Sequence, residues 1–283
     1  MTLVYDAITD ELTALLNADH KNGGRRIRRF RNLAIWKTGA RYFPMTMHKS
    51  VDLPPEKGPY LFGYHPHGVL GLGHFFGFAC NALGIEEHFP GVFVHGTTLE
   101  TNFNVPFLRD LILATGMIGA GKQSLNHVLS KKKESVVLVV GGAAEAMDAV
   151  PGTNRLTLNK RFGFIKIAIK NGASLVPVFA FGENDIWDQV PNPPGSFVRN
   201  FQSLVKKLTG ASPVLFYGRF GIIPYRRPVN VVVGMPLAVV KNEEPSDEEV
   251  AQVHALYVER LTMLYHAHKD TYLASRTAEL IIC

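Results

Sequence analysis

The chain of 283 residues has only two cysteines, Cys80 and Cys283, and little glycine or proline beyond the average. Two cysteines are too few for a disulfide framework or a four-cysteine zinc site, which excludes a small disulfide-rich secreted domain. Glycine (26) and proline (17) are too sparse for a collagen-like or low-complexity chain. With 46% hydrophobic residues, the sequence has enough apolar material for a globular core.

The sequence also has no uninterrupted apolar run that suits a membrane span. Residues 58–85 lack Asp, Glu, Lys and Arg and are long enough to cross a bilayer. However, Pro66 between two histidines, together with several glycines, is costly at the bilayer centre. A signal peptide is excluded because Asp6, Asp10 and Glu11 stand where positive charge and then apolar residues are needed. We therefore expect a chain without a membrane span.

Acidic residues are absent from residues 20–51, which hold nine of the 30 lysines and arginines. The remainder has 21 basic against 24 acidic residues, so the net charge of +6 arises from this segment. Such a cluster suits anionic lipid headgroups, and a solvated basic face is the alternative. This cluster is the only feature of the sequence that would suit a nucleic acid, so we expect no nucleic-acid partner.

Short apolar runs alternate with helical patterns, which predicts an α/β fold with a mostly parallel central sheet flanked by helices. Pro177 favours a start or edge position for its strand, and Ser246 with Glu249 forms a capping box. The predicted strands are residues 60–64, 92–95, 136–140, 175–181 and 229–233, and the predicted helices are residues 70–83, 162–170 and 246–269.

No linker divides the sequence, so we predict one domain over residues 23–283. A short amphipathic segment, residues 1–22, precedes this domain. In it Ile8, Leu12 and Leu15 fall at helical spacing.

The sharpest chemical signal is the motif His65–Pro66–His67–Gly68, directly after the predicted strand 60–64. Ligands of α/β sheets bind at the carboxyl ends of strands, where an imidazole can take a proton from a hydroxyl at neutral pH. The alternative is a pair of structural, hydrogen-bonded histidines. Two histidines also need further ligands to hold a metal, and no third ligand is near, so we expect no metal site.

Two further segments carry candidate site residues. Gly141 and Gly142 follow the strand 136–140 and leave room for a substrate, and the nearby Glu145 can orient an imidazole. The alternative is that Glu145 stabilises a helix start. Arg161 and Lys166 flank a helix start that suits an anion such as the phosphates of coenzyme A, with a solvated helix face as the alternative.

Several blocks together resemble the type-2 diacylglycerol acyltransferase family, which includes the monoacylglycerol and wax-alcohol acyltransferases. The resemblance covers roughly residues 23–272. The blocks are YFP at 42–44, FGYHPHG at 62–68, TLETNF at 98–103, VVGGAAEA at 139–146, RFGFIKIAIKNGASLVPVFAFGEN at 161–184 and VVVGMP at 231–236.

The resemblance implies a glycerolipid-acyltransferase-like fold and a catalytic role for His67, with His65 beside it. It implies that Glu145 is the carboxylate partner of the imidazole. It also implies a lipid-facing entrance at three consecutive residues and substrate contacts elsewhere. The implied entrance is Tyr42, Phe43 and Pro44, and the expected substrate-binding residues further include Gly68, Asn102, Gly141, Gly142, Arg161, Gly163 and Lys166.

The implied reaction moves a fatty acyl group from acyl-CoA to the hydroxyl of diacylglycerol, without a metal or redox cofactor. Monoacylglycerol or a long-chain alcohol is the alternative acceptor, and an inactive lipid-binding short form is a further alternative. The resemblance places the protein at the cytosolic face of the endoplasmic reticulum and on lipid droplets. Family members usually carry a hydrophobic hairpin before the segment matching Gly23, and only about 22 residues precede it here. The alternatives are a truncated form, a partial gene model, and a member held on the membrane by interfacial contacts alone. Association of this chain with further copies of itself is a further alternative.

Overall fold

The computed structural model describes residues 20–191, 193, 195–209 and 214–283. The expected amphipathic helix with Ile8, Leu12 and Leu15 lies outside these residues. None of the described helices combines the length and the apolarity that a membrane span needs.

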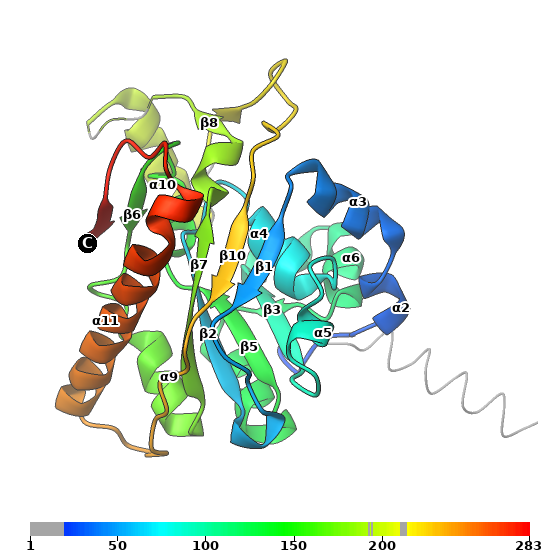
Figure 1. The fold of residues 1–283 in the computed structure, drawn as a ribbon, viewed down its shortest axis with the longest axis vertical. Coiled ribbons are helices and arrows are strands. Elements are labelled where there is room, and N and C mark those ends of the chain that lie inside the picture. Colours follow the sequence, from blue (N-terminus) through cyan, green and yellow to red (C-terminus); the bar gives the residue numbers. More distant parts are fainter. Residues whose placement is uncertain (1–19, 192, 194, 210–213) are drawn as a thin grey trace, which may run out of the picture.

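A seven-stranded sheet in the order β1-β10-β7-β2-β5-β3-β4 forms the centre of the molecule (Figure 1). Five neighbouring pairs are parallel, and only β10 with β7 is antiparallel. This confirms the predicted α/β fold with a mostly parallel sheet. The strands are β1 (Thr46–Lys49), β2 (Tyr60–His65), β3 (Val94–Thr98), β4 (Ile118–Gly119), β5 (Ser135–Val139), β7 (Ser174–Phe181) and β10 (Asn230–Val233).

Helices cover both faces of this sheet (Figure 1). The helices are α2 (Arg28–Arg31), α3 (Ala34–Tyr42), α4 (Leu72–His74), α5 (Ile85–His88), α6 (Leu108–Ala114), α7 (Lys122–Asn126), α8 (Gly142–Ala146), α9 (Gly163–Asn171), α10 (Phe197–Thr209) and α11 (Asp247–Tyr272), with a π-helical turn, η2 (Phe75–Ala79), after α4. Two short pairs complete the fold, namely β6 (Asn154–Leu156) with β11 (Leu280–Ile282), and β8 (Asp188–Gln189) with β9 (Phe216–Tyr217).

The sheet separates two apolar cores because side chains alternate along each strand. Leu61 faces the core that α7, α9 and α11 cover, whereas the next residue, Phe62, faces the core beneath α3, η2 and α5. Both residues are fully buried. A parallel sheet covered on both faces explains why its strands are continuous apolar runs.

The predicted end of α9 and the predicted start of α11 are confirmed, whereas α11 ends at Tyr272, three residues later than predicted. Gly172 adopts a left-handed conformation (φ 62°) after α9, where glycine carries no steric penalty. The Ser246 hydroxyl accepts a hydrogen bond from the Glu249 N–H (3.1 Å) at the start of α11. Such a cap satisfies one of the N–H groups that a helix start leaves unpaired.

The expectation that Pro177 marks a strand start or edge is wrong. Its strand, β7, lies between β10 and β2 in the interior of the sheet. The Pro177 carbonyl accepts from Gly234 N–H (2.8 Å), just past the last residue of β10. The absent N–H therefore faces the point where β10 ends, and the ladder between the two strands loses no hydrogen bond.

Two other predicted elements differ from those observed. The helix expected over residues 70–83 is confined to α4 and η2 and ends at Ala79, because the guanidinium of Arg31 binds the Phe78 and Ala79 carbonyls (3.2 and 2.7 Å). The strand expected over residues 92–95 runs from Val94 to Thr98 instead. Its pairing with β5 and β4, both distant in sequence, determines these bounds.

Candidate active site

Three neighbouring parallel strands, β7, β2 and β5, end at the same edge of the sheet. The loop after β2 carries His67. Glu145 follows β5 in the short helix α8, and Glu183 follows β7 after Gly182. Three titratable side chains, distant in sequence, therefore meet where ligands of α/β sheets bind.

A cavity of about 610 Å³ opens at this edge of the sheet. His67 lines it together with mostly apolar side chains from the segments after β2, β3 and β5. Its size and its few polar groups among apolar walls are typical of small-molecule sites. The apolar lining includes Leu70, Phe75, Leu99, Leu108, Leu111 and Phe216.

The ring of His67 has a defined tautomer. Its Nδ1 lies 2.9 Å from the Gly68 carbonyl oxygen, and because a carbonyl only accepts, Nδ1 donates the proton. The neutral ring therefore carries its free electron pair on Nε2. Burial lowers the pKa of His67 below its usual 6.5, against the opposing effect of the Gly68 carbonyl. The imidazole is thus neutral and able to accept a proton at pH 7.

Glu145 contacts the main chain of His67, whereas we had expected it to contact the imidazole. Its Oε1 accepts from the His67 N–H (2.6 Å) and its Oε2 from the Thr157 N–H (2.8 Å). The side chain folds back against Gly141, where a Cβ would collide with the carboxylate. Burial raises the pKa of the carboxyl to about 7, although these two N–H groups favour its charged form.

Glu183 was not identified from the sequence. Its side chain is buried, and Oε2 accepts from the Tyr64 hydroxyl (2.8 Å) and from the Gly73 N–H (2.9 Å). Burial raises its pKa to about 7, as for Glu145. A recognisable signal was present, since each of these glutamates is the first acidic residue after an apolar strand that ends in glycine.

His74 is a second histidine of the cavity wall that sequence reasoning missed. It is buried, and its Nε2 accepts from the Thr97 N–H at 3.4 Å. Burial, and to a lesser extent the nearby His67, lower its pKa to about 4. His74 is therefore neutral beside His67 at pH 7.

His65 does not line the cavity. As the last residue of β2 it faces the α11 side of the sheet, where Nε2 lies 3.0 Å from the Tyr257 hydroxyl. Burial lowers its pKa to about 3, so the ring stays neutral. Alternation alone would place residues 65 and 67 on the same face, so the two histidines are separated because β2 ends at His65 and the chain leaves the strand before His67. The geometry favours the structural alternative for this histidine.

Among the other expected substrate-binding residues, Asn102 and Gly142 line the cavity. The Asn102 amide donates to the Thr98 hydroxyl (2.7 Å). Gly68 supplies the carbonyl that binds the His67 ring, and the Gly141 carbonyl accepts from Arg161 (3.0 Å). These residues are gathered within one region of the structure.

Other expected residues lie outside the cavity lining. Gly163, the first residue of α9, is exposed, and no heavy atom lies within 4 Å of a Cβ placed there. Lys166 is also exposed and lies 3.8 Å from Asp247. At these two positions the geometry favours the alternative of a solvated helix face.

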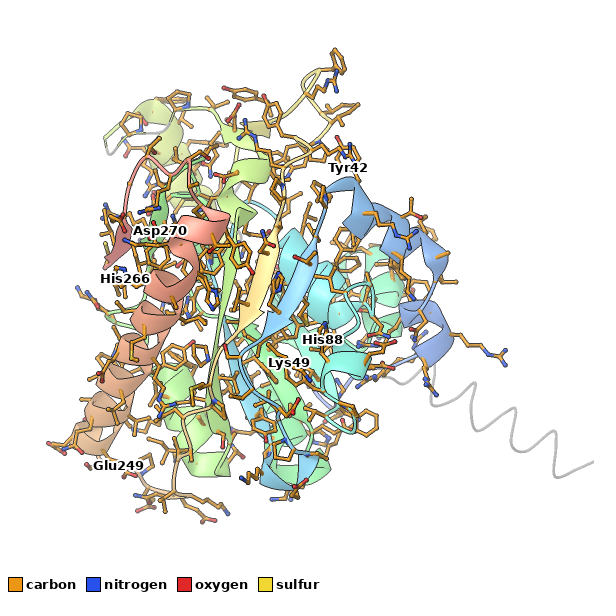
Figure 2. The ribbon with its side chains drawn as sticks, in the orientation of Figure 1. Tyr42, Lys49, His88, Glu249, His266 and Asp270 are labelled. Carbon is orange, nitrogen blue, oxygen red and sulfur yellow. The ribbon has the colours of Figure 1, made fainter. Side chains whose placement is uncertain are left out.

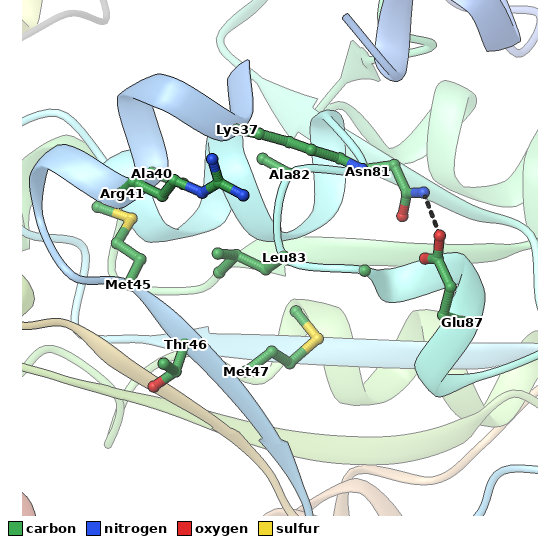
Figure 3. A pocket seen from close by; sticks show the side chains of 11 residues that line it. Lys37, Ala40, Arg41, Met45, Thr46, Met47, Asn81, Ala82, Leu83 and Glu87 are labelled. Carbon is green, nitrogen blue, oxygen red and sulfur yellow. Dashed lines mark hydrogen bonds between the residues drawn. The ribbon is translucent and has the colours of Figure 1, made fainter. Parts of the chain in front are cut away.

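The expected lipid-facing entrance lies apart from the cavity. Tyr42 ends α3 (Figure 2), and its hydroxyl donates to the Pro224 carbonyl (2.7 Å), while Phe43 is buried. The adjoining pocket (Figure 3) has a volume of about 410 Å³. It shares no lining residue with the cavity of His67. Pro44 is exposed beside it. The pocket is lined by Lys37, Ala40, Arg41, Met45, Thr46, Met47, Asn81, Ala82, Leu83, Gly84 and Glu87.

The basic residues of the segment 20–51 fall into two groups in the structure, one buried or paired with acidic side chains and the other exposed. Arg31 is buried, Arg26 pairs with Glu86 (2.9 Å), and Arg25 lies 3.3 Å from Asp110. The second group consists of the exposed cations of α2 and α3. Among the described residues, Lys37 and Arg41 have no acidic partner within 4 Å. These exposed cations are Arg28, Arg29, Lys37 and Arg41.

Histidine, cysteine and acidic side chains do not assemble into any group of three that is able to hold a metal ion within the described part of the chain. The site therefore consists of a neutral imidazole, two buried carboxylates and apolar walls. This combination is suited to removing a proton from an uncharged, largely apolar hydroxyl compound.

Comparison with known proteins identifies the relatives of the chain. The family model described as diacylglycerol acyltransferase matches residues 9–283. Diacylglycerol O-acyltransferase 2 of Dictyostelium discoideum is 47% identical over 270 residues, which cover 93% of this chain and 82% of that protein. The 2-acylglycerol O-acyltransferase 1 of Bos taurus is 42% identical over 260 residues, which cover 89% and 77%.

Among solved structures, the acyltransferase PlsC of Thermotoga maritima, which acts on 1-acyl-sn-glycerophosphate, matches with a TM-score of 0.49 and 11% sequence identity. The match covers 89% of this chain and 80% of that one.

Proposed function

Because the chain belongs to the diacylglycerol acyltransferase family and is an O-acyltransferase, we propose that it acylates the free hydroxyl of diacylglycerol with a fatty acyl group from acyl-CoA. The product is triacylglycerol. Family membership confirms the resemblance that the sequence blocks predicted. The observation that carries the proposal is a neutral His67 with its Nε2 electron pair free in an apolar cavity.

His67 acts as the general base. Its Nε2 takes the proton of the acceptor hydroxyl as the oxygen attacks the thioester carbonyl carbon of acyl-CoA. The carbon–sulfur bond then breaks, and the imidazolium returns the proton to the departing thiolate. The steps form one ester and one free thiol, with acyl-CoA as a co-substrate and without a metal or a redox cofactor.

Glu145 supports this step through the main chain. By accepting the His67 N–H at 2.6 Å, its carboxylate fixes the peptide from which the imidazole projects. In the proposal, its charge also favours the imidazolium that forms during the reaction. Its role in the proposal is therefore to position His67 and to stabilise the transient positive charge.

Diacylglycerol is the first candidate acceptor because relatives from Dictyostelium discoideum, Schizosaccharomyces pombe and Homo sapiens are named diacylglycerol O-acyltransferases. Monoacylglycerol is the second candidate, because the bovine 2-acylglycerol O-acyltransferase is 42% identical while the human diacylglycerol O-acyltransferase 2 is 38% identical. Overall identity thus does not separate the two acceptors, and a direct assay must decide.

We also propose that the protein works on a lipid surface, at the cytosolic face of the endoplasmic reticulum and on lipid droplets. The acceptor is insoluble in water and is available only from such a surface. The exposed cations of α2 and α3 and the exposed apolar side chains Leu33 and Ile35 between them support this proposal. A helix with this pattern suits the interface of an anionic membrane.

The test is an acyl-transfer assay with labelled oleoyl-CoA and detergent-solubilised protein, offered diacylglycerol, monoacylglycerol or hexadecanol in parallel. Substituting His67→Ala should lower kcat by about 10²- to 10⁴-fold, because it removes general-base assistance. The control is His88→Ala, which changes a histidine outside the cavity lining and should keep the wild-type rate. Wild-type turnover in the His67→Ala protein would refute the role of His67 as the base. Turnover of monoacylglycerol alone would show that monoacylglycerol, and not diacylglycerol, is the acceptor.

A further inference from the structure

We propose that Glu183 is a second positioning residue of the reaction, which fixes the Gly68 carbonyl and thereby the direction of the His67 imidazole. The inference rests on the proposed role of His67 as the base. It adds a residue that the sequence motifs left without a role.

The two buried glutamates hold the loop after β2 from opposite sides. The strand order β7-β2-β5 places Glu183 on one side of this loop and Glu145 on the other. Glu145 binds the His67 N–H, while Glu183 lies against Gly68, the next residue. Two consecutive residues of the loop are thus held between side chains that follow the two neighbouring strands.

The contact between Glu183 and Gly68 leaves no spare room. Gly68 has φ 64°, and a Cβ placed on it would lie 2.6 Å from Glu183 Cγ and 3.2 Å from the Glu183 carbonyl oxygen. The Gly68 carbonyl is the group that accepts from His67 Nδ1. The side chain of Glu183 therefore limits the movement of the carbonyl that orients the base.

Glu183 is itself immobilised by donors on β2 and α4. Its Oε2 accepts from the Tyr64 hydroxyl, on the fully buried strand β2, and from the Gly73 N–H, in α4. The second contact fixes the start of the helical segment that carries His74 and Phe75 into the cavity wall. Glu183 thus links the loop of the base with the wall of the cavity.

The experiment compares Glu183→Leu with Glu183→Gln in the acyl-transfer assay. Leucine removes the acceptor, whereas the glutamine amide oxygen can still accept from both donors. We expect Glu183→Leu to lower kcat by about 10²-fold with KM for the acceptor within about threefold, because a misplaced base slows chemistry more than binding. Glu183→Gln should stay within about threefold of the wild-type kcat. Glu259→Leu, on the exposed face of α11, is the matched control.

If Glu183→Leu does not fold, Tyr64→Phe tests the inference instead. This variant removes the hydroxyl that donates to Glu183 and leaves the contact with the Gly73 N–H in place. We expect it to lower kcat about three- to tenfold without changing KM. A wild-type kcat in Glu183→Leu or in Tyr64→Phe would overturn the inference. An equal loss in Glu183→Gln and Glu183→Leu would also overturn it, because charge and not geometry would then matter.

His67→Ala in the same assay separates this inference from the proposed function. If His67→Ala keeps its activity, the proposed function fails. If His67→Ala loses activity while the Glu183 and Tyr64 variants do not, only the inference about Glu183 fails.

Discussion

Burial determines which side chains at the end of the central strands are charged. It lowers the pKa of His67 below 6.5 and raises the pKa of Glu145 and of Glu183 to about 7. Desolvation disfavours the charged form in each case. A neutral base beside carboxyl groups that titrate near neutrality is typical of sites that move protons.

The lowered pKa of His67 predicts the shape of the pH profile. A base works in its neutral form, so kcat/KM should fall as the pH decreases through the pKa of His67, and the midpoint of this limb should lie below pH 6.5. The profile of the detergent-solubilised enzyme measures it. Glu145→Gln serves as the control, because the limb should remain when the carboxyl near pH 7 is removed. A midpoint above pH 6.5 in both proteins would contradict the assignment.

At the scale of elements, the end of a helix depends on the residues at that end, whereas its packing depends on the central sheet. The helix α9 packs against β7 and against α11, and it is followed by Gly172 in the left-handed region. A side chain at that position is strained by its backbone conformation and also meets Lys241, whose Cβ lies 3.1 Å from the added Cβ. The end of this helix thus depends on one glycine.

Gly172→Ala should therefore lower the free energy of unfolding by at least about 1 kcal/mol, because alanine in the left-handed region costs roughly 1–2 kcal/mol. Gly163→Ala, at the start of the same helix, is the matched control. Its added methyl meets no neighbour, so it should leave stability unchanged or raise it by up to about 1 kcal/mol. Urea unfolding measures both. Equal stability of the two variants would show that the glycine at the C-terminus of α9 has no special role.

For the whole molecule, the segment of residues 20–51, which lacks acidic residues, contributes exposed cations on one side. The exposed cations of α2 and α3 lie to the right in Figure 1, and β6 and the start of α9 lie across the sheet. Exposed cations gathered on one face favour an orientation with that face toward an anionic surface. The proposed docking on lipid thus predicts dependence on particular cations and on salt.

Flotation with vesicles of phosphatidylcholine, with or without phosphatidylserine, tests this dependence. Arg28→Gln with Lys37→Gln should weaken binding to the anionic vesicles by roughly 30-fold, because each cation near such a surface contributes about 1 kcal/mol. The control pair, Arg155→Gln with Lys160→Gln, lies on the opposite side and should change binding little. Binding should also weaken with added salt. Equal losses in the two pairs would contradict docking through α2 and α3.

Much of the fold follows from short-range pattern. The continuous apolar run at residues 136–140 predicted the strand β5, and Gly172 and Ser246 predicted the limits of α9 and α11. The interior position of Pro177 was not predictable, because the end of the neighbouring strand, and not the proline, decides whether its missing N–H matters.

The sequence by itself determined the family, the α/β class and the histidine motif after a buried strand, since these depend on residues close together in the chain. Only the tertiary structure decided that His67 faces the cavity while His65 faces α11. It alone showed that Glu145 binds a main-chain N–H and that Glu183 joins the site. The physical reason is that strand order, which brings β7 and β5 to the two sides of β2, arises from pairing between distant segments.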